Sequence, residues 1–194
     1  MRRSIFIFHG SYGHPKENWF PWIKEKLEKL GHTVFIPRFP VPKGIKPGGH
    51  HLDEWLNEFD KYREYVDEDA IIIGHSRGAV FSYHLLPTLS KQISSLYLVG
   101  GWLNYHWYPK VSKKVESFHK KPFLWKKIKE NAKYIEFYQS SNDPTGIPIS
   151  DGKTIAGYLG AKFILVKESG HFSSSYDKKY KKFPLLLDNI KKRL

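Results

Sequence analysis

A serine between two glycines follows a run of apolar residues, and these residue types in this order could form a catalytic nucleophile. Apolar residues 70–73 lead directly into Gly74-His75-Ser76-Arg77-Gly78, which matches the G-x-S-x-G pattern, and helix-compatible residues come next. In such a nucleophile elbow, a buried parallel strand ends in a sharp turn that holds the serine hydroxyl clear of neighbouring side chains. The glycines fit because a tight turn brings backbone close to backbone, where a Cβ would collide. We therefore predict that Ser76 is a nucleophile.

A serine nucleophile needs a base to accept its proton and a carboxylate to orient that base. Residues 134–139 are rich in aromatic and β-branched side chains and predict a strand, and Asp143 lies in the loop that follows. Residues 163–166 predict the next strand, with His171 in the loop after it. The order Ser76, Asp143, His171 is the chain order of α/β-hydrolase triads. The sequence therefore predicts His171 as the base and Asp143 as the acid. The other candidates fall in the elbow, in another turn or in expected helices: His9, His75, His84, Asp151, Asp177 and Asp188.

Acyl transfer also needs main-chain N–H groups that stabilise the oxyanion formed on the substrate. One comes from the residue after the nucleophile and the other from the loop after the first strand. Arg77 fills the first position, and residues 4–8 predict a buried first strand. In the loop that follows, Ser11 is the preferred second donor and Tyr12 the alternative. A glycine-containing turn without a catalytic part is the other interpretation of this loop.

The sequence resembles the small α/β-hydrolases of the retinoblastoma-binding-protein and YdeN type, a family of compact serine hydrolases. The resemblance rests on His9-Gly10 and on residues 18–23, 72–76, 122–129, 142–148 and 170–172. It implies a triad of Ser76, Asp143 and His171. Two features depart from the expected pattern: Arg77, where a small, polar or aliphatic residue is expected, and a long loop rich in proline and glycine at residues 37–49. These departures affect the expected substrate rather than the chemistry.

Strand-like and helix-like segments alternate along the chain, which predicts a parallel sheet covered by helices on both faces. Strands are expected at residues 4–8, 33–36, 70–73, 93–99, 134–139 and 162–166, and helices at 19–30, 52–66, 77–86, 152–159 and 176–192. We expect an α/β-hydrolase-like three-layer sandwich with strand order 2-1-3-4-5-6, because right-handed crossovers then place the three triad residues on one carboxyl edge. The length of 194 residues suits a single domain over residues 1–194.

A segment rich in aromatic and basic residues, 101–125, interrupts this alternation and predicts a lid or cap. Loops at the carboxyl edge build substrate pockets, so Trp102, Trp107 and Tyr12 are candidate pocket residues. The same aromatic side chains would serve equally well to close the core beneath a loop. Arg77 also has two interpretations: its guanidinium could bind an anionic group of the substrate, or turn along the helix start to pair with a surface carboxylate.

Composition limits the expected partners and setting. The formal net charge is +13, but the lysines are spread over expected surface positions without a nucleic-acid motif, so we expect only non-specific attraction to polyanions and no specific nucleic acid. The absence of cysteine excludes disulfides and fits a reducing cytoplasm. No signal-peptide-like or membrane-spanning stretch is seen, so we expect a cytoplasmic protein that binds no membrane, with a monomer as the default. The segment His50-His51-x-Asp53 is too poor a ligand set for a metal, and no cofactor motif occurs, so neither metal nor cofactor is expected.

These features together predict a cofactor-free serine hydrolase that cleaves a small carboxylic ester, with thioesters and amides as alternative substrates. Ser76 would attack the carbonyl, His171 would take and return the proton, and Asp143 would stabilise the imidazolium. The alternative function, from a different class, is a hydrolase-fold protein-interaction module whose triad is physiologically silent. Covalent labelling of Ser76 by a fluorophosphonate distinguishes the two.

Overall fold

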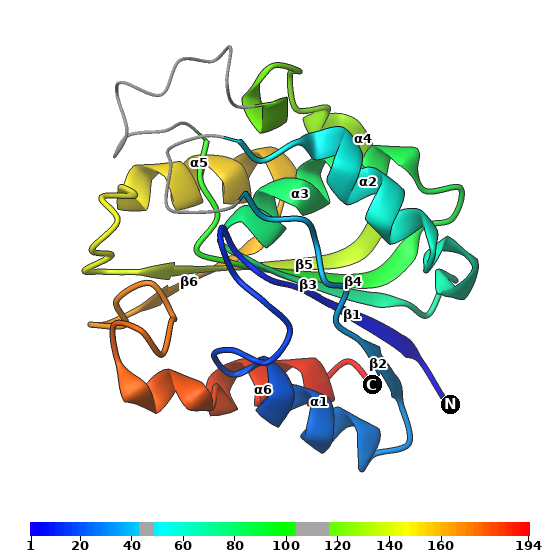
Figure 1. The fold of residues 1–194 in the computed structure, drawn as a ribbon, viewed down its shortest axis with the longest axis horizontal. Coiled ribbons are helices and arrows are strands. Elements are labelled where there is room, and N and C mark those ends of the chain that lie inside the picture. The colour runs from blue at the N-terminus through cyan, green and yellow to red at the C-terminus, as the bar shows by residue number, and fades with distance from the viewer. Residues whose placement is uncertain (43–48, 104–116) are drawn as a thin grey trace.

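The structure, a computed structural model, describes residues 1–42, 49–103 and 117–194, and its centre is a sheet of six parallel strands (Figure 1). The strands are β1 (Ser4–Phe8), β2 (Thr33–Phe35), β3 (Ile71–His75), β4 (Ile93–Val99), β5 (Ala132–Ser140) and β6 (Lys162–Val166). They lie in the order β2-β1-β3-β4-β5-β6, and each neighbouring pair is parallel. The predicted fold class and strand order are confirmed.

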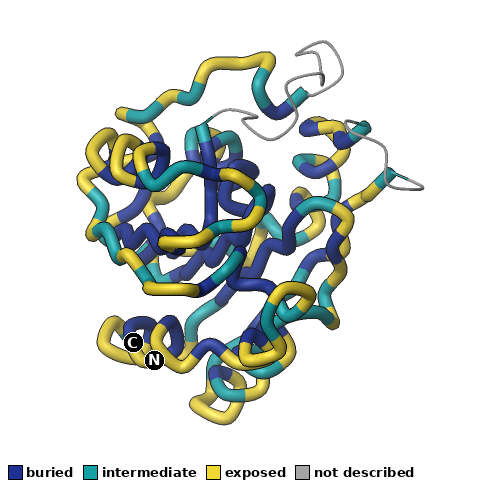
Figure 2. Tube along the Cα trace, turned by 90° about the vertical axis from the view of Figure 1, so that its left-hand side faces the viewer, coloured by how far each residue is buried: buried dark blue, intermediate teal, exposed yellow. Residues whose placement is uncertain are grey.

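Helices cover both faces of this sheet, as Figure 1 shows. On one face lie α1 (Phe20–Glu28) and α6 (Pro184–Lys191), and on the other lie α2 (Leu52–Asp60), α3 (Arg77–Leu85), α4 (Trp125–Glu130) and α5 (Ile149–Leu159). Alternate residues of β1 belong to different cores: Ile5 and Ile7 pack with α1 and α6, whereas Phe6 and Phe8 pack with the helices of the opposite face. Because both faces are covered, the inner strands are continuous apolar runs, and Figure 2 shows them as the buried centre of the molecule.

The helix predicted over residues 52–66 is shorter in the structure. It ends at Asp60, and Arg63–Tyr65 form a separate 3₁₀ turn. Tyr62 and Val66 nevertheless pack against the core. The apolar spacing therefore continues past the end of the α-helix, which is why the sequence pattern overestimates its length.

The predicted C-terminal helix over residues 176–192 is also shorter, because it begins only at Pro184. Proline lacks an N–H group and restricts the residue before it, so the helix cannot extend further back. Lys178–Lys181 instead form a 3₁₀ turn. α4 was not predicted, since it has six residues and buries only Ile128, which leaves no apolar stripe to detect. None of the helices in the described ranges is long and apolar enough to cross a bilayer.

The carboxyl ends of the parallel strands form one edge of the sheet, and the loops after β1, β3, β5 and β6 meet there. The lid predicted over residues 101–125 would belong to this edge. Residues 104–116 lie outside the described residues, so the lid and the single-domain organisation stay predictions. At the two described ends of that segment, the side chains of Trp102 and Phe118 are fully buried.

Candidate active site

Ser76 lies in a strained turn between β3 and α3. Its φ of 56° and ψ of −121° fall in a region that residues other than glycine rarely occupy, and such strain costs on the order of 1–3 kcal/mol. A Cβ added to Gly74 would lie 2.5 Å from the carbonyl oxygen of Gly78, and a Cβ added to Gly78 would lie 2.3 Å from that of Phe8. The turn therefore requires glycine on both sides of Ser76.

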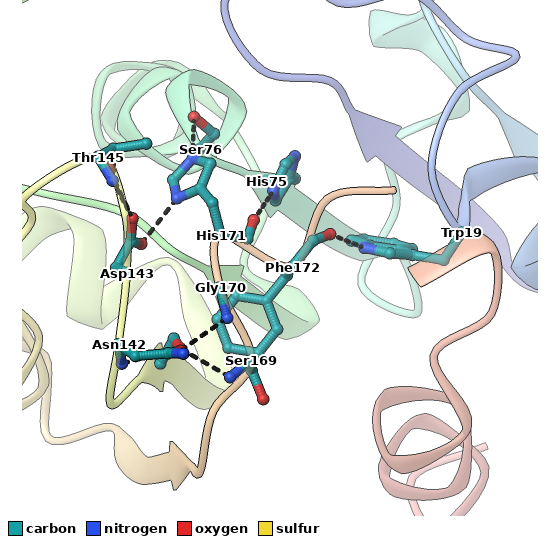
Figure 3. A network of polar contacts seen from close by, with 11 residues as sticks. Trp19, His75, Ser76, Asn142, Asp143, Thr145, Ser169, Gly170, His171 and Phe172 are labelled. Carbon is teal, nitrogen blue, oxygen red and sulfur yellow. Dashed lines mark hydrogen bonds and ion pairs between the residues drawn. The ribbon is translucent and has the colours of Figure 1, made fainter. Parts of the chain in front are cut away.

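Ser76, His171 and Asp143 form a chain of hydrogen bonds that joins three loops (Figure 3). The Oγ of Ser76 lies 2.8 Å from Nε2 of His171, and Oδ2 of Asp143 lies 2.7 Å from Nδ1 of His171. The other oxygen of Asp143 accepts hydrogen bonds from the main-chain N–H of Thr145 at 2.9 Å and from its hydroxyl at 2.6 Å. The structure thus brings together the three residues that the sequence singled out, and it adds Thr145.

The electrostatics of this chain fix the protonation of the imidazole. Burial raises the pKa of the Asp143 carboxyl, but hydrogen bonds from His171 and Thr145 outweigh burial and lower this pKa below its usual value. An ionised carboxylate can only accept hydrogen bonds, so Nδ1 of His171 carries a proton. In the neutral imidazole, Nε2 is then free to accept the proton of the Ser76 hydroxyl, as a general base requires.

Three side chains that sequence reasoning did not identify hold the loop of His171 in place, and Figure 3 shows all three. Oδ1 of Asn142 accepts the main-chain N–H of the residue before His171 at 2.9 Å, and Nε1 of Trp19 donates to the carbonyl of the residue after it at 3.1 Å. The ring of His75 donates from Nε2 to the carbonyl of His171 itself at 2.8 Å. Burial lowers the pKa of His75 to about 3, so this ring is a neutral donor. Both Asn142 and Trp19 lie in segments that carry the family resemblance, but nothing in the sequence shows where their side chains point.

The loop after β1 lies directly against the nucleophile, since a Cβ on Gly10 would lie 2.9 Å from Cβ of Ser76. The side chain of Arg77 holds the same loop, because its Nε donates a hydrogen bond of 2.8 Å to Oγ of Ser11. Arg77 is only 3% exposed, and its guanidinium lies 5.0 Å from the ring centre of Phe118. The side chain of Arg77 is therefore buried and does not lie at the surface.

The three aromatic residues suggested for the pocket lie in different places. Tyr12 lines the cavity above Ser76. Trp102 is fully buried, with its ring centre 5.9 Å from the guanidinium carbon of Arg77, and it does not belong to the described lining of that cavity. For Trp102, the structure therefore favours the interpretation that its side chain closes the core beneath a loop. Trp107 lies outside the described residues.

The cavity above Ser76 has a volume of about 320 Å³ and is lined by both polar and apolar surface. It is formed by Gly10, Ser11, Tyr12, Glu17, Asn18, His75, Ser76, Thr145, His171, Ser173, Ser175 and Tyr176. Neither Arg77 nor any lysine is among these described residues. A larger and more apolar cavity of about 390 Å³ lies over the C-terminal part of α3 and does not reach Ser76. Within the described residues, no group of three or more His, Asp or Glu side chains could hold a metal ion.

A parallel sheet in this strand order, with a serine on a strand-to-helix elbow, is the architecture of the α/β-hydrolases. Residues 5–192 match the family model described as serine hydrolase, and the chain belongs to this family.

Relatives agree with this assignment. The chain is 28% identical over 192 residues to YdeN of Bacillus subtilis (strain 168), covering 97% of this chain and 94% of that protein. It is 27% identical over 158 residues to the serine hydrolase RBBP9 of Rattus norvegicus, covering 81% and 79% of the two chains. The crystal structure of the ydeN gene product from B. subtilis superposes with a TM-score of 0.85 at 25% identity, over 98% of both chains. Est1E from Butyrivibrio proteoclasticus has the same fold, with a TM-score of 0.72 at 15% identity over 98% of this chain and 86% of that one.

Proposed function

We propose that this serine hydrolase cleaves a small carboxylic ester through an acyl-enzyme formed on Ser76. The observation that carries the proposal is the unbroken hydrogen-bond chain from Asp143 through His171 to Ser76, with links of 2.7 and 2.8 Å. The cavity of about 320 Å³ above the serine supports a small substrate, because ligand pockets range from about 300 to 1,000 Å³.

The proposed reaction proceeds in two halves. Ser76 Oγ attacks the carbonyl carbon while Nε2 of His171 takes the hydroxyl proton, and Asp143 stabilises the imidazolium that results. The bond between the carbonyl carbon and the leaving oxygen then breaks, and the imidazolium gives its proton to that oxygen, so the alcohol departs. Water then attacks the carbonyl carbon of the acyl-enzyme while His171 takes a proton from this water. The bond from the carbonyl carbon to Ser76 Oγ breaks, His171 returns the proton to Ser76 Oγ, and the carboxylic acid is released.

The negative charge on the substrate oxygen needs donors on the side of Ser76 that faces the loop after β1. We assign this role to the main-chain N–H groups of Ser11 and Arg77, as the sequence suggests. Arg77 is the first residue of α3, where helical geometry leaves N–H groups without intrahelical acceptors. The hydrogen bond from the Arg77 side chain to Ser11 supports this assignment, because it fixes the two proposed donors relative to each other.

Hydrolysis of p-nitrophenyl acetate tests the proposal. The wild-type protein should release p-nitrophenol with a burst followed by steady turnover, and Ser76→Ala should abolish both phases. Ser90→Ala is the matched control, because Ser90 is exposed and distant from the elbow in sequence. If the folded wild-type protein released no more product than Ser76→Ala, the ester hydrolase would be wrong and an interaction module would be favoured.

A further inference from the structure

The cavity above Ser76 contains a carboxylate that the proposed mechanism does not use, that of Glu17. Its side chain folds back on the loop after β1, since a Cβ on Gly13 would lie 2.4 Å from Oε1 of Glu17. The next residue, Asn18, is fixed to the loop after β6: its Oδ1 accepts the main-chain N–H of Ser174 at 2.9 Å and the hydroxyl of Ser173 at 3.1 Å. Glu17 is therefore held between the loop of the proposed oxyanion donors and the loop of the base.

Within the described residues, Glu17 forms no ion pair with a lysine or an arginine, although the chain carries a formal net charge of +13, and the basic side chain that acts on it is His14. Two neighbouring glutamates are paired: Glu25 contacts Lys29 at 2.6 Å, and Glu28 contacts Lys24 at 2.6 Å. Burial raises the pKa of the Glu17 carboxyl and outweighs the opposing effects of the His14 side chain and of a hydrogen bond from the His14 main chain. A positive group of a ligand in the cavity would supply the missing partner.

The rest of the lining also suits a positive group. The described lining contains no lysine or arginine, and Arg77 is buried, with its Nε donating to Ser11 and its guanidinium near the ring of Phe118. Tyr12 and Tyr176 line the same cavity, and the face of a tyrosine ring attracts ammonium groups. The charge of the cavity is thus opposite to the one that an anionic substrate would need.

We propose that the site, acting as the ester hydrolase proposed above, selects esters that carry an ammonium group, and that Glu17 is the residue that determines this specificity. The attraction between a half-buried carboxylate and an ammonium group is stronger than at the surface, because less water screens it. Glu17 selects the substrate by its charge, and Ser76, His171 and Asp143 carry out the acyl transfer.

Two isosteric ester pairs test the proposal. In the first, acetylthiocholine is compared with its neutral carbon isostere, dimethylbutyl thioacetate. Both release a thiol that a disulfide reagent detects, and the protein contributes no background because it has no cysteine. In the second pair, p-nitrophenyl trimethylammoniobutyrate, which carries the charge in its acyl group, is compared with its neutral tert-butyl isostere. We expect the wild-type kcat/KM to favour the cationic member of at least one pair by about tenfold. Glu17→Gln should remove most of this preference.

Glu25→Gln is the matched control, because it removes the same charge from an exposed position of α1, and the ratio within each pair should not change. If both pairs are cleaved in a Ser76-dependent manner but the ratios stay near one, or do not respond to Glu17→Gln, the specificity proposal is wrong while the hydrolase stands. If no ester is cleaved, both proposals fail. A wild-type preference for the neutral esters would also overturn the role of Glu17.

Discussion

Asp143→Asn should remove most of the esterase activity while the protein stays folded, and the hydrogen bonds around the carboxylate give the reason. One oxygen of Asp143 accepts two hydrogen bonds from Thr145, and the other accepts one from Nδ1 of His171. An asparagine has one acceptor oxygen and one donor NH₂ group. Its oxygen should face Thr145, because the opposite orientation would set the NH₂ against two donors. The NH₂ then faces Nδ1 of His171 and requires that nitrogen to be unprotonated.

In this tautomer the proton of His171 is on Nε2, which points at Ser76 and can no longer accept its proton. We therefore expect kcat to fall by about 10²–10⁴, which corresponds to about 3–5.5 kcal/mol. The assay is p-nitrophenyl acetate turnover at saturating substrate, with circular dichroism to confirm the fold.

Asp151→Asn is the matched control for this variant. Asp151 is also buried, but its carboxylate accepts the main-chain N–H of Leu103 at 2.9 Å, and it does not belong to the hydrogen-bond chain of Asp143, His171 and Ser76. Its kcat should change by only a few fold. Near-wild-type turnover of Asp143→Asn, or an equal loss in Asp151→Asn, would refute the reasoning.

Three further predictions concern the support of the site. Arg77→Met and Ser11→Ala should each lower kcat more than they change KM. The kcat of the double variant should be no lower than that of the more damaging single variant, because both substitutions remove the same hydrogen bond of 2.8 Å. Additive losses in kcat would contradict this coupling. Gly78→Ala should lower the free energy of unfolding in urea by about 1–3 kcal/mol or more, since the added Cβ would lie 2.3 Å from the last carbonyl oxygen of β1. Gly157→Ala, in α5 with nothing within 4 Å of the added Cβ, should instead raise it by up to about 1 kcal/mol; equal signs would contradict the packing argument. Because the folded-state pKa of Asp143 is lowered from 3.8, its carboxylate stabilises the fold above that pH, and the contribution is lost as the pH falls through the lowered value. The stability difference between wild type and Asp143→Asn should therefore shrink in acid, and a constant difference would contradict the assignment.

The sheet could be predicted from the sequence because buried parallel strands are apolar runs bounded by loop residues. Residues 4–8 and 93–99 form strands with the predicted bounds. Given the strand ends, parallel topology alone places Ser76, Asp143 and His171 at one edge of the sheet. The predicted proximity of these residues therefore required no knowledge of side-chain contacts.

The direction of individual side chains could not be predicted in this way. Glu17 lines the cavity because the next residue, Asn18, is hydrogen-bonded to Ser173 and Ser174, which follow it by 155 and 156 positions in the chain. Arg77 points into the core because Ser11 and Phe118, from two other segments, surround it. Local spacing along the chain carries no information on such long-range contacts, so the charge of the substrate cavity was visible only in three dimensions.

Covalent labelling by a fluorophosphonate tests whether Ser76 is an activated nucleophile. Intact-protein mass spectrometry should show one adduct on the wild-type protein, and peptide mapping should place it on Ser76. Ser90→Ala should be labelled at the wild-type rate, and Ser76→Ala should gain no adduct. A folded wild-type protein that stays unlabelled, or a Ser76→Ala variant that is labelled as fast as wild type, would contradict the account.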